Sequence, residues 1–262
     1  MVRVTRKRFG QHFLHDPRII GAIVEAIGPG RDDPLVEIGP GRGALTGPLL
    51  ERVGRLHVVE IDRDLARDLR ALEPDPCRLV VHTADALRFD FSAIAARGLR
   101  IAGNLPYNIS TPLLFHLLAQ DAAIADMHFT LQKEVVDRMV AAPGSRTYGR
   151  LSVMLQAACR VERLFGIGRG AFQPPPRVDS SFVRLVPERV IAIDDAECFK
   201  GIVRRAFTRR RKTLRNALAG LVEASDFAGA GIDAGRRPET LSPADFARLA
   251  NLVTGRGGST AI

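Results

Sequence analysis

The segment from Asn104 to Tyr107 carries residue types that suit a rigid, polar binding loop with an aromatic tip. Asn104 offers an amide group, and Pro106 restricts the backbone of Leu105 before it, so the carbonyl groups of the segment point in set directions. Tyr107 adds a flat face beside them. We interpret Asn104, Leu105, Pro106 and Tyr107 as the reaction centre. The alternative is a structural turn in which Asn104 satisfies backbone groups and Tyr107 fills a gap.

A glycine-rich turn forms a second candidate site, directly after the apolar run Leu35–Ile38. Glycines let the backbone approach a ligand closely, and the start of a following helix adds unpaired N–H groups. Gly39 and Gly41 therefore predict a turn that binds an adenosine-containing ligand. Gly39, Gly41 and Ala44 also satisfy the dinucleotide pattern G-x-G-x-x-A, so an NAD-dependent enzyme stays open as an alternative.

Two acidic residues follow the glycines at the ends of the next predicted strands. Glu60 ends the strand Leu56–Glu60, about 20 residues after the glycines, where a carboxylate can bind both ribose hydroxyls. Asp85 comes after the strand Leu79–Val81, and its carboxylate could accept from the exocyclic amine of an adenine. The alternatives are a solvated carboxylate for Glu60 and a simple loop cap for Asp85.

An aromatic residue precedes a run of three prolines at positions 174–176. Because the prolines stiffen this connection, we predict that Phe172 is presented as a fixed stacking platform. A phenylalanine in the hydrophobic core is the alternative.

The formal net charge of +9 and a pI near 10.4 point to a polyanionic partner, and nucleic acid is the expected class. A helical pattern over residues 204–215 contains a cluster of basic residues. A continuous helix would place Arg210 inside its apolar arc, which predicts a break near Thr208 with basic residues grouped at the junction. Phosphate contacts are the functional interpretation of the cluster, and a solvated face is the alternative. The candidate RNA contacts are Arg204, Arg205, Arg209, Arg210, Arg211 and Lys212.

The order of apolar runs predicts an α/β fold. Short apolar runs alternate with helical patterns, which is typical of a parallel sheet covered by helices on both faces. Asn104 then lies at the carboxyl end of the strand Leu99–Ala102, where open α/β sheets bind ligands. Only helical patterns follow the predicted linker Pro187–Asp195. We expect a basic N-terminal arm over residues 1–16, a sheet domain over 17–190 and a small helical domain over 191–262.

Several helix ends are marked by residue type. Asp16 and Asp62 are predicted N-caps, and Gly28 is predicted to stop the first helix. Ser110 or Thr111 is expected to cap the helix that follows the reaction centre, with a proline in its first turn. Ser242 is expected to cap the last helix.

Cysteine usage and hydropathy narrow the class of protein. Three widely spaced cysteines without a C-x-x-C pair are typical of reduced cysteines in an intracellular protein, and they indicate neither a metal site nor a disulfide framework. No run approaches the roughly 20 apolar residues that cross a bilayer. The basic start lacks the apolar core of a signal peptide. We therefore expect a cytoplasmic protein without a bound metal or a membrane partner.

Taken together, these residues resemble one family closely. Glu37–Gly43 resembles the S-adenosylmethionine fingerprint of class I methyltransferases, and Asn104–Tyr107 resembles the amino-methylating motif of N6-adenine enzymes. Arg8–Leu14 and Phe172–Ser180 narrow the match to the bacterial small-subunit ribosomal RNA adenine dimethyltransferases, the KsgA or RsmA family, over nearly the whole chain. Asp126–Phe129 and Leu131–Val135 match the same family.

The resemblance implies a Rossmann-like methyltransferase domain with a small helical RNA-binding domain. It implies dimethylation at N6 of two adjacent adenosines in the hairpin loop near the 3′ end of 16S ribosomal RNA, in a pre-assembled 30S subunit, by a monomer. It carries S-adenosylmethionine contacts onto His12, Leu14, Gly39, Gly41, Glu60, Asp85 and Asn104. One departure is His12, where some members have Asn.

The same resemblance implies a chemistry in which Asn104 and Leu105 accept hydrogen bonds from the adenine N6, while Tyr107 and Phe172 stack on the base. The nearest alternative is a related antibiotic-resistance methyltransferase that acts on an adenosine of 23S ribosomal RNA. An alternative of another class is a ribosome-assembly factor that acts mainly by binding. A dehydrogenase is disfavoured because no clear hydride-handling His or Lys constellation is present.

Overall fold

The computed structural model describes residues 12–188 and 190–257, which divide into two compact units. The first comprises the described residues up to Val136 together with Glu162–Pro187, and the second comprises Asp137–Val161 together with the described residues from Glu188 onward. In these described ranges, no helix combines the length and the apolar character that a membrane span requires. The predicted N-terminal arm lies mostly outside the described residues.

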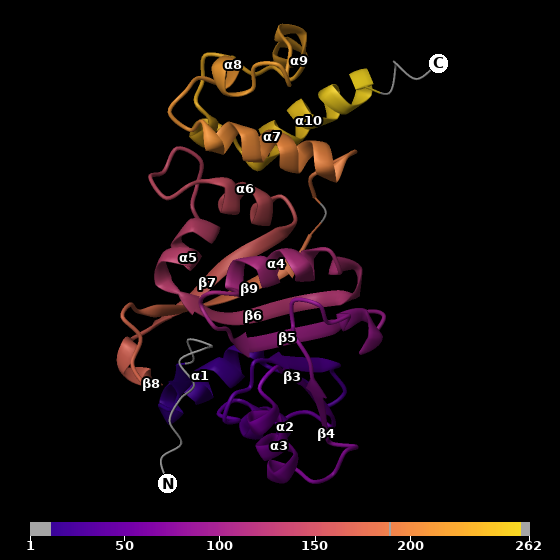
Figure 1. The fold of residues 1–262 in the computed structure, drawn as a ribbon, viewed down its shortest axis with the longest axis vertical. Helices are drawn as coiled ribbons and strands as arrows, with labels where there is room; N and C mark the ends of the chain where they lie inside the picture. The colour runs from indigo at the N-terminus through magenta and orange to yellow at the C-terminus, as the bar shows by residue number, and fades with distance from the viewer. Residues whose placement is uncertain (1–11, 189, 258–262) are drawn as a thin grey trace. The chain divides into compact units, whose positions relative to one another are not determined.

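A seven-stranded sheet with the order β4-β3-β2-β5-β6-β9-β7 forms the centre of the first unit (Figure 1). The strands from β4 to β6 in this order are parallel to their neighbours. β9 is antiparallel to β6, with Met127 opposite Leu185 and Gln132 opposite Ser180. The strands are β2 (Leu35–Ile38), β3 (Leu56–Glu60), β4 (Leu79–Thr83), β5 (Leu99–Asn104), β6 (Ile124–Gln132), β7 (Cys159–Ile167) and β9 (Ser180–Pro187).

β9 departs from the predicted parallel arrangement of the sheet, while the predicted α/β fold class is confirmed. A parallel neighbour needs a long crossover connection, usually a helix that covers the sheet. The chain between β7 and β9 instead runs through a short 3₁₀ helix, Arg169–Ala171, and the two-residue strand β8 (Phe172–Gln173). β8 pairs with β1 (Phe13–Leu14) in a separate small sheet.

The helices of this unit end largely where the capping residues predict. Asp16 accepts from a backbone N–H at the start of α1, Gly28 ends α1 with φ of 54°, and Asp62 caps α3. The helix after the reaction centre differs, because Ser110 is its first residue and bonds back to the Tyr107 carbonyl. The helices are α1 (Pro17–Ile27), the five-residue α2 (Thr46–Leu50), α3 (Arg63–Leu72) and α4 (Ser110–Leu118), with 3₁₀ turns at Phe91–Ala93 and Asp121–Ala123.

A buried ion network ties three strands together below the ligand-binding ends of the sheet. Asp126, only 5% exposed on β6, accepts from Arg100 Nε at 2.9 Å and Nη2 at 3.0 Å, and from Arg184 Nη2 at 3.2 Å. A buried carboxylate needs such partners, since leaving it unpaired is costly. The network therefore holds β5, β6 and β9 in a fixed arrangement, and β5 carries Asn104 at its end.

The second unit is helical and includes a segment from within the predicted sheet domain. Residues 137–161 belong to this unit, in addition to the described residues from Glu188 onward. The reason is packing: the Tyr148 hydroxyl donates to the Leu241 carbonyl at 2.8 Å, and Tyr148 is fully buried. Its helices are α6 (Arg150–Gln156), α7 (Ala196–Thr208), α8 (Leu214–Ala217), α9 (Ala224–Gly229), α10 (Pro243–Gly257) and the end of α5 (Lys133–Met139), with a 3₁₀ turn at Pro238–Thr240 (Figure 1).

The predicted break in the basic segment is confirmed. α7 ends at Thr208 and α8 begins at Leu214, so the run from Arg209 to Lys212 lies in a connection. The predicted cap of the last helix is also confirmed, because the backbone N–H of Asp245 donates to Ser242 Oγ at 3.1 Å.

Candidate active site

A cavity of about 340 Å³ opens at the carboxyl ends of the parallel strands β2, β3, β4 and β5. This is the edge at which open α/β sheets bind ligands. The cavity brings together most of the site residues predicted from the sequence. Those that line it are His12, Leu14, Gly39, Gly41, Glu60, Asp85, Asn104, Leu105, Pro106 and Tyr107.

The glycine turn brings bare backbone to the cavity wall. Gly39 and Gly41 have φ values of 66° and 58°, in the left-handed region that favours glycine. A Cβ on Gly41 would lie 3.0 Å from the ring of Phe13, so a side chain would also crowd this wall. The turn therefore suits a ligand that packs directly against main chain.

Glu60 is placed and oriented by the same turn. Its carboxylate is 3% exposed and accepts from the backbone N–H of Gly41 at 3.2 Å and of Asp62 at 2.9 Å. Burial raises the pKa of the Glu60 carboxyl, because the charged form loses hydration. A carboxylate held by backbone donors at a cavity wall suits a pair of ligand hydroxyls, such as those of a ribose.

The far side of the cavity combines one acceptor with apolar surface. Asp85 Oδ1 accepts from the backbone N–H of Leu87 at 2.9 Å, which orients the carboxylate as a loop cap while it still lines the cavity. Ile61 is 49% exposed and lines the same cavity, together with Ala86. A flat heterocycle with an exocyclic amine fits a slot of this kind, so the donor set and the glycine wall fit an adenosine ligand.

The amide of Asn104 has a defined orientation. Its Nδ2 donates to the carbonyl oxygen of His12 at 2.9 Å. Since a carbonyl oxygen only accepts, the amide nitrogen must face His12, and this contact fixes which atom is nitrogen and which is oxygen. Asn104 Oδ1 is therefore left as an acceptor for a ligand.

Of the carbonyl groups in the loop after Asn104, some accept hydrogen bonds within the protein and others do not. The Pro106 carbonyl accepts from the backbone N–H of Ile109 at 3.2 Å, and the Tyr107 carbonyl accepts from Ser110 Oγ at 3.1 Å. Over the described part of the chain, no protein donor reaches the Leu105 carbonyl. Asn104 Oδ1 and the Leu105 carbonyl are thus two acceptors that the loop leaves for a ligand.

Tyr107 is held beside these acceptors as a half-buried ring. Its hydroxyl lies 2.8 Å from Ser180 Oγ, and its ring centroid lies 5.6 Å from that of His12. A tyrosine hydroxyl is neutral at physiological pH, and burial raises the pKa of the Tyr107 hydroxyl further. The aromatic face is accordingly uncharged and electron-rich, and it is fixed by contacts at both ends.

Phe172 lies in the hydrophobic core, which is the alternative to the predicted fixed stacking platform. The side chain is 2% exposed and belongs to a hydrophobic cluster with Ile23, Leu35 and Phe182. Its backbone lies opposite Leu14 in the small β1–β8 sheet, and this pairing turns the ring into the core. Burial of a large aromatic side chain outweighs presentation to solvent at this position.

The segment from His12 to Leu14 lines the cavity and is held there by backbone hydrogen bonds and by the hydrophobic core. The His12 ring contacts the Pro174 carbonyl through Nδ1 at 2.8 Å, and Leu14 is 4% exposed. Since His12 meets Asn104 through its carbonyl oxygen, this contact does not depend on the side chain at position 12. The presence of His at position 12, where some family members have Asn, therefore leaves the hydrogen bond from Asn104 Nδ2 to the His12 carbonyl intact.

Two residues of the site were given no role of their own in the sequence analysis. A Cβ on Gly103 would lie 2.5 Å from the Ile38 carbonyl oxygen, so only glycine lets the ends of β5 and β2 lie this close. Glu37 is 1% exposed and lines the cavity, and its carboxyl bonds to Thr46 Oγ1 at 2.6 Å. Burial raises the pKa of Glu37 to about 7. An acid within an otherwise apolar strand was the available signal for Glu37, whereas nothing local identified Gly103.

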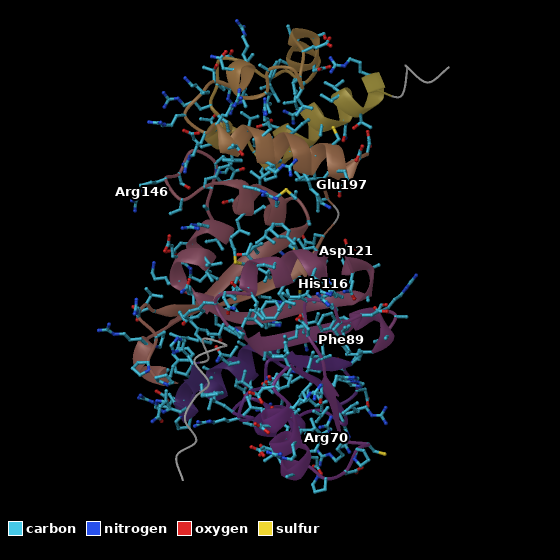
Figure 2. All side chains as sticks on the ribbon, viewed as in Figure 1. Arg70, Phe89, His116, Asp121, Arg146 and Glu197 are labelled. Atoms are coloured by element: carbon cyan, nitrogen blue, oxygen red, sulfur yellow. The ribbon has the colours of Figure 1, made fainter. Side chains whose placement is uncertain are left out.

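The six candidate RNA contacts of the second unit fall into two groups. Five have no ion pair among residues 12–188 and 190–257, and one of these, Arg209, donates from its side chain to the Asn216 carbonyl at 3.4 Å. Arg210 differs, because its Nε lies 3.8 Å from Glu239 Oε2 and its Nη2 donates to the Arg146 carbonyl at 3.1 Å (Arg146 is labelled in Figure 2). We name the exposed group the basic cluster: Arg204, Arg205, Arg209, Arg211 and Lys212.

The sequence matches one family model and many curated proteins. The model described as "Ribosomal RNA adenine dimethylase" matches residues 2–254. Ribosomal RNA small subunit methyltransferase A of Alcanivorax borkumensis is 56% identical over 252 residues, which cover 95% of this chain and 90% of that protein. The protein of the same name from Marinobacter nauticus is 52% identical over 256 residues, which cover 97% of this chain and 93% of that protein.

Solved structures agree with these matches. A dimethyladenosine transferase from Plasmodium falciparum has a TM-score of 0.83 at 26% identity, covering 94% of this chain and 98% of that one. The 23S rRNA methyltransferase ErmE has a TM-score of 0.72 at 25% identity, covering 92% of this chain and 99% of that one.

Proposed function

This chain belongs to the ribosomal RNA adenine dimethylase family, and on that premise we propose that it dimethylates N6 of two adjacent adenosines in the 3′-terminal hairpin loop of 16S ribosomal RNA. The chain is an adenine dimethyltransferase that uses S-adenosylmethionine as the methyl donor. The assignment to 16S ribosomal RNA rests on relatives at 51–56% identity whose names specify the small subunit. We propose that it acts as a monomer on the 30S subunit during its assembly in the cytoplasm.

The observation that carries this proposal is the pair of unused acceptors beside a neutral aromatic ring. Asn104 Oδ1 and the Leu105 carbonyl are fixed at the mouth of a cavity that fits an adenosine ligand, with Tyr107 next to them. An exocyclic amino group has two N–H donors, which match two acceptors. An aromatic side chain then supports a base that has left its stack.

The two acceptors make the target nitrogen a better nucleophile. The lone pair of adenine N6 is delocalised into the purine ring, which makes the amine a poor nucleophile. Hydrogen bonds from its N–H groups to Asn104 Oδ1 and the Leu105 carbonyl favour a pyramidal nitrogen with its lone pair localised. S-adenosylmethionine, when bound, supplies an electrophilic methyl group. The nitrogen that has accepted a methyl group is cationic and acidic, so water can take its proton without a dedicated base.

Positioning contributes more than stabilisation of charge in this site. The face of Tyr107 attracts the cationic nitrogen, and a cation–π contact contributes roughly 0.5–2 kcal/mol. Orienting two bound reactants contributes about 7–11 kcal/mol. The residues that fix the loop, including the His12 carbonyl and Ser180, are therefore as important as those that touch the base.

The methyl donor is held by residues that the cavity brings together. We propose that Glu60 binds the ribose hydroxyls, that Asp85 accepts from the adenine amine, and that the Gly39–Gly41 turn packs against the ligand. His12 and Leu14 cover it from the N-terminal segment. S-adenosylhomocysteine should raise the melting temperature of the protein, and NAD should not. Stabilisation by NAD alone would instead support a dehydrogenase.

The basic cluster is proposed to bind RNA phosphates. Its side chains are exposed, and the guanidinium and ammonium groups suit phosphate oxygens. Arg210 supports this surface from within, since it links the α7–α8 connection to Glu239 and to the Arg146 carbonyl.

The deciding experiment is methyl transfer from labelled S-adenosylmethionine to unmethylated 30S subunits and, separately, to 50S subunits, with the modified nucleotides mapped. We expect dimethyladenosine at two adjacent positions of the 30S RNA. Label on 50S alone would refute the proposal and indicate a substrate of the kind named for ErmE, whose structure is similar. Label on neither subunit would favour a role in assembly by binding.

A further inference from the structure

The loop of residues 174–179 is attached to the cavity wall at both ends. The Pro174 carbonyl lies 2.8 Å from His12 Nδ1, and Ser180 Oγ lies 2.8 Å from the Tyr107 hydroxyl. His12 and Tyr107 both line the cavity. Arg177 is three residues from each attachment, and three residues span at most about 10 Å. The backbone of Arg177 is therefore held at the rim of the cavity.

This loop presents a free cation and an apolar side chain to solvent. Arg177 is exposed and forms no ion pair with any residue that the structure describes, and Val178 is 45% exposed. Pro176, next to Arg177, is buried. Asp179, the nearest acid in sequence, accepts from the backbone N–H of Arg169 at 3.2 Å. The loop is thus anchored, while the Arg177 guanidinium has no ion-pair partner within residues 12–188 and 190–257 and Val178 is exposed.

A flipped base explains why such side chains lie at this rim. The target adenosine must leave its stack to enter the cavity, but its backbone and its neighbouring nucleotide stay outside. A phosphate beside the flipped nucleotide then lies at the cavity mouth, where it needs a cation. A guanidinium can bind phosphate oxygens in bidentate fashion, and an apolar side chain can pack on the face of an unstacked neighbouring base.

We propose that Arg177 binds a backbone phosphate next to the methylated adenosine and that Val178 packs against the neighbouring base. The inference rests on the proposed function and extends it, because it names the rim residues that position the RNA strand at the catalytic loop. These residues lie in the sheet unit, so they act separately from the basic cluster of the helical unit.

The test compares Arg177→Ala with Arg177→Lys and with a matched control, Arg97→Ala. Arg97 is likewise exposed and has no ion pair in the described ranges, but it lies before the amino end of β5, at the opposite end of the strands from the cavity. Arg177→Ala should raise the KM for the 30S substrate about tenfold, with a smaller change in kcat. The slope of log K against log salt should flatten by about 0.7, the value for one single-strand phosphate contact. Arg177→Lys should keep the slope, and Arg97→Ala should change neither quantity.

Val178→Glu supplies a second, independent variant. Because Val178 is exposed, the change should leave the melting temperature and the shift caused by S-adenosylhomocysteine unaltered, while the added anion should raise the KM for RNA at least as much as Arg177→Ala. If wild-type protein methylates 30S subunits and both variants match Arg97→Ala, the rim inference is wrong and the proposed function stands. If wild-type protein methylates no ribosomal RNA, the proposed function itself fails.

Discussion

The hydrogen bond from Asn104 Nδ2 to the His12 carbonyl, 2.9 Å long, decides which end of the amide faces the substrate. Asn104→Asp keeps the size of the side chain and keeps an oxygen toward the cavity, but it removes the N–H. The carboxylate then meets the His12 carbonyl oxygen with no hydrogen between them. We therefore expect Asn104→Asp to be severely impaired, although an aspartate can still accept from an adenine amine.

The magnitude follows from the contact that is lost. Leaving a half-buried acceptor without its donor costs about 1–3 kcal/mol, and repulsion between two oxygens adds to this. At about 1.4 kcal/mol for each factor of ten, the loss corresponds to roughly 10- to 100-fold in rate. Rotation of the carboxylate away from His12 also displaces the catalytic oxygen, and a displacement of about 1 Å costs about 100-fold. We expect kcat to fall at least about 100-fold, and Asn104→Ala to abolish turnover.

The assay is single-turnover methyl transfer to unmethylated 30S subunits at saturating S-adenosylmethionine, with RNA affinity measured separately. Both Asn104 variants should bind RNA within about threefold of wild type, because the change lies in the catalytic loop. Asn108→Asp is the matched control, since it adds the same charge to the same loop at an exposed residue that also lines the cavity but makes no contact with the His12 carbonyl. It measures the purely electrostatic effect, which we expect to be less than about fivefold.

Two outcomes would contradict this account of the site. If Asn104→Asp transfers methyl groups within about threefold of Asn108→Asp, the His12 contact does not orient the amide during catalysis. If Asn104→Ala methylates 30S subunits at a near-normal rate, the Asn104 acceptor itself is not part of the chemistry.

Three further predictions concern stability and RNA binding. Gly103→Ala should lower the melting temperature and the activity, because its Cβ would lie 2.5 Å from the Ile38 carbonyl oxygen. Relief of such overpacking costs about 1–3 kcal/mol. The control Gly166→Ala, at a strand position with no atom within 4 Å of the added Cβ, should lower neither quantity. The raised pKa of Glu37, about 7, means that the native state binds this proton more tightly than the unfolded state. The free energy of unfolding of the wild type should then fall as the pH rises from 4.5 to about 7. Compared with Glu37→Gln, which lacks this proton, the additional fall should be at most about 3 kcal/mol. Urea titrations at several pH values would detect or exclude this difference. Replacing residues 209–211 by alanine should weaken RNA binding and flatten its salt dependence, and an unchanged slope would show that this run is only a solvated surface.

Local patterns predicted the strands of the parallel half of the sheet. The structure has strands over both predicted ranges, Leu35–Ile38 and Leu56–Glu60. Short apolar runs that end at turn residues are typical of strands in a parallel sheet, whose two faces are both buried. Asp16 and Asp62 cap the helices that follow them, since an N-cap acts on N–H groups two or three residues away. Such features depend only on neighbouring residues.

The features that the sequence patterns did not indicate share a different cause. Phe172 is buried and β9 runs antiparallel because of partners far away in the sequence, Leu14 in one case and β6 in the other. The assignment of residues 137–161 to the helical unit depends on contacts such as that of Tyr148 with Leu241. Arg210 is paired within the protein by Glu239, which no local pattern around either residue indicated.

The sequence by itself determined the candidate groups for the chemistry: Asn104 and Tyr107 in a proline-stiffened loop, and a glycine turn followed by Glu60 and Asp85 at strand ends. Parallel strands place their carboxyl ends at one edge, so these groups had to meet. Only the tertiary structure decided how each group is oriented. The His12 carbonyl sets the Asn104 amide, Ser180 holds the Tyr107 hydroxyl, and Gly103 admits the close approach of two strands. These contacts join segments up to 92 residues apart, and orientation at that range is set by packing, which a local pattern does not encode.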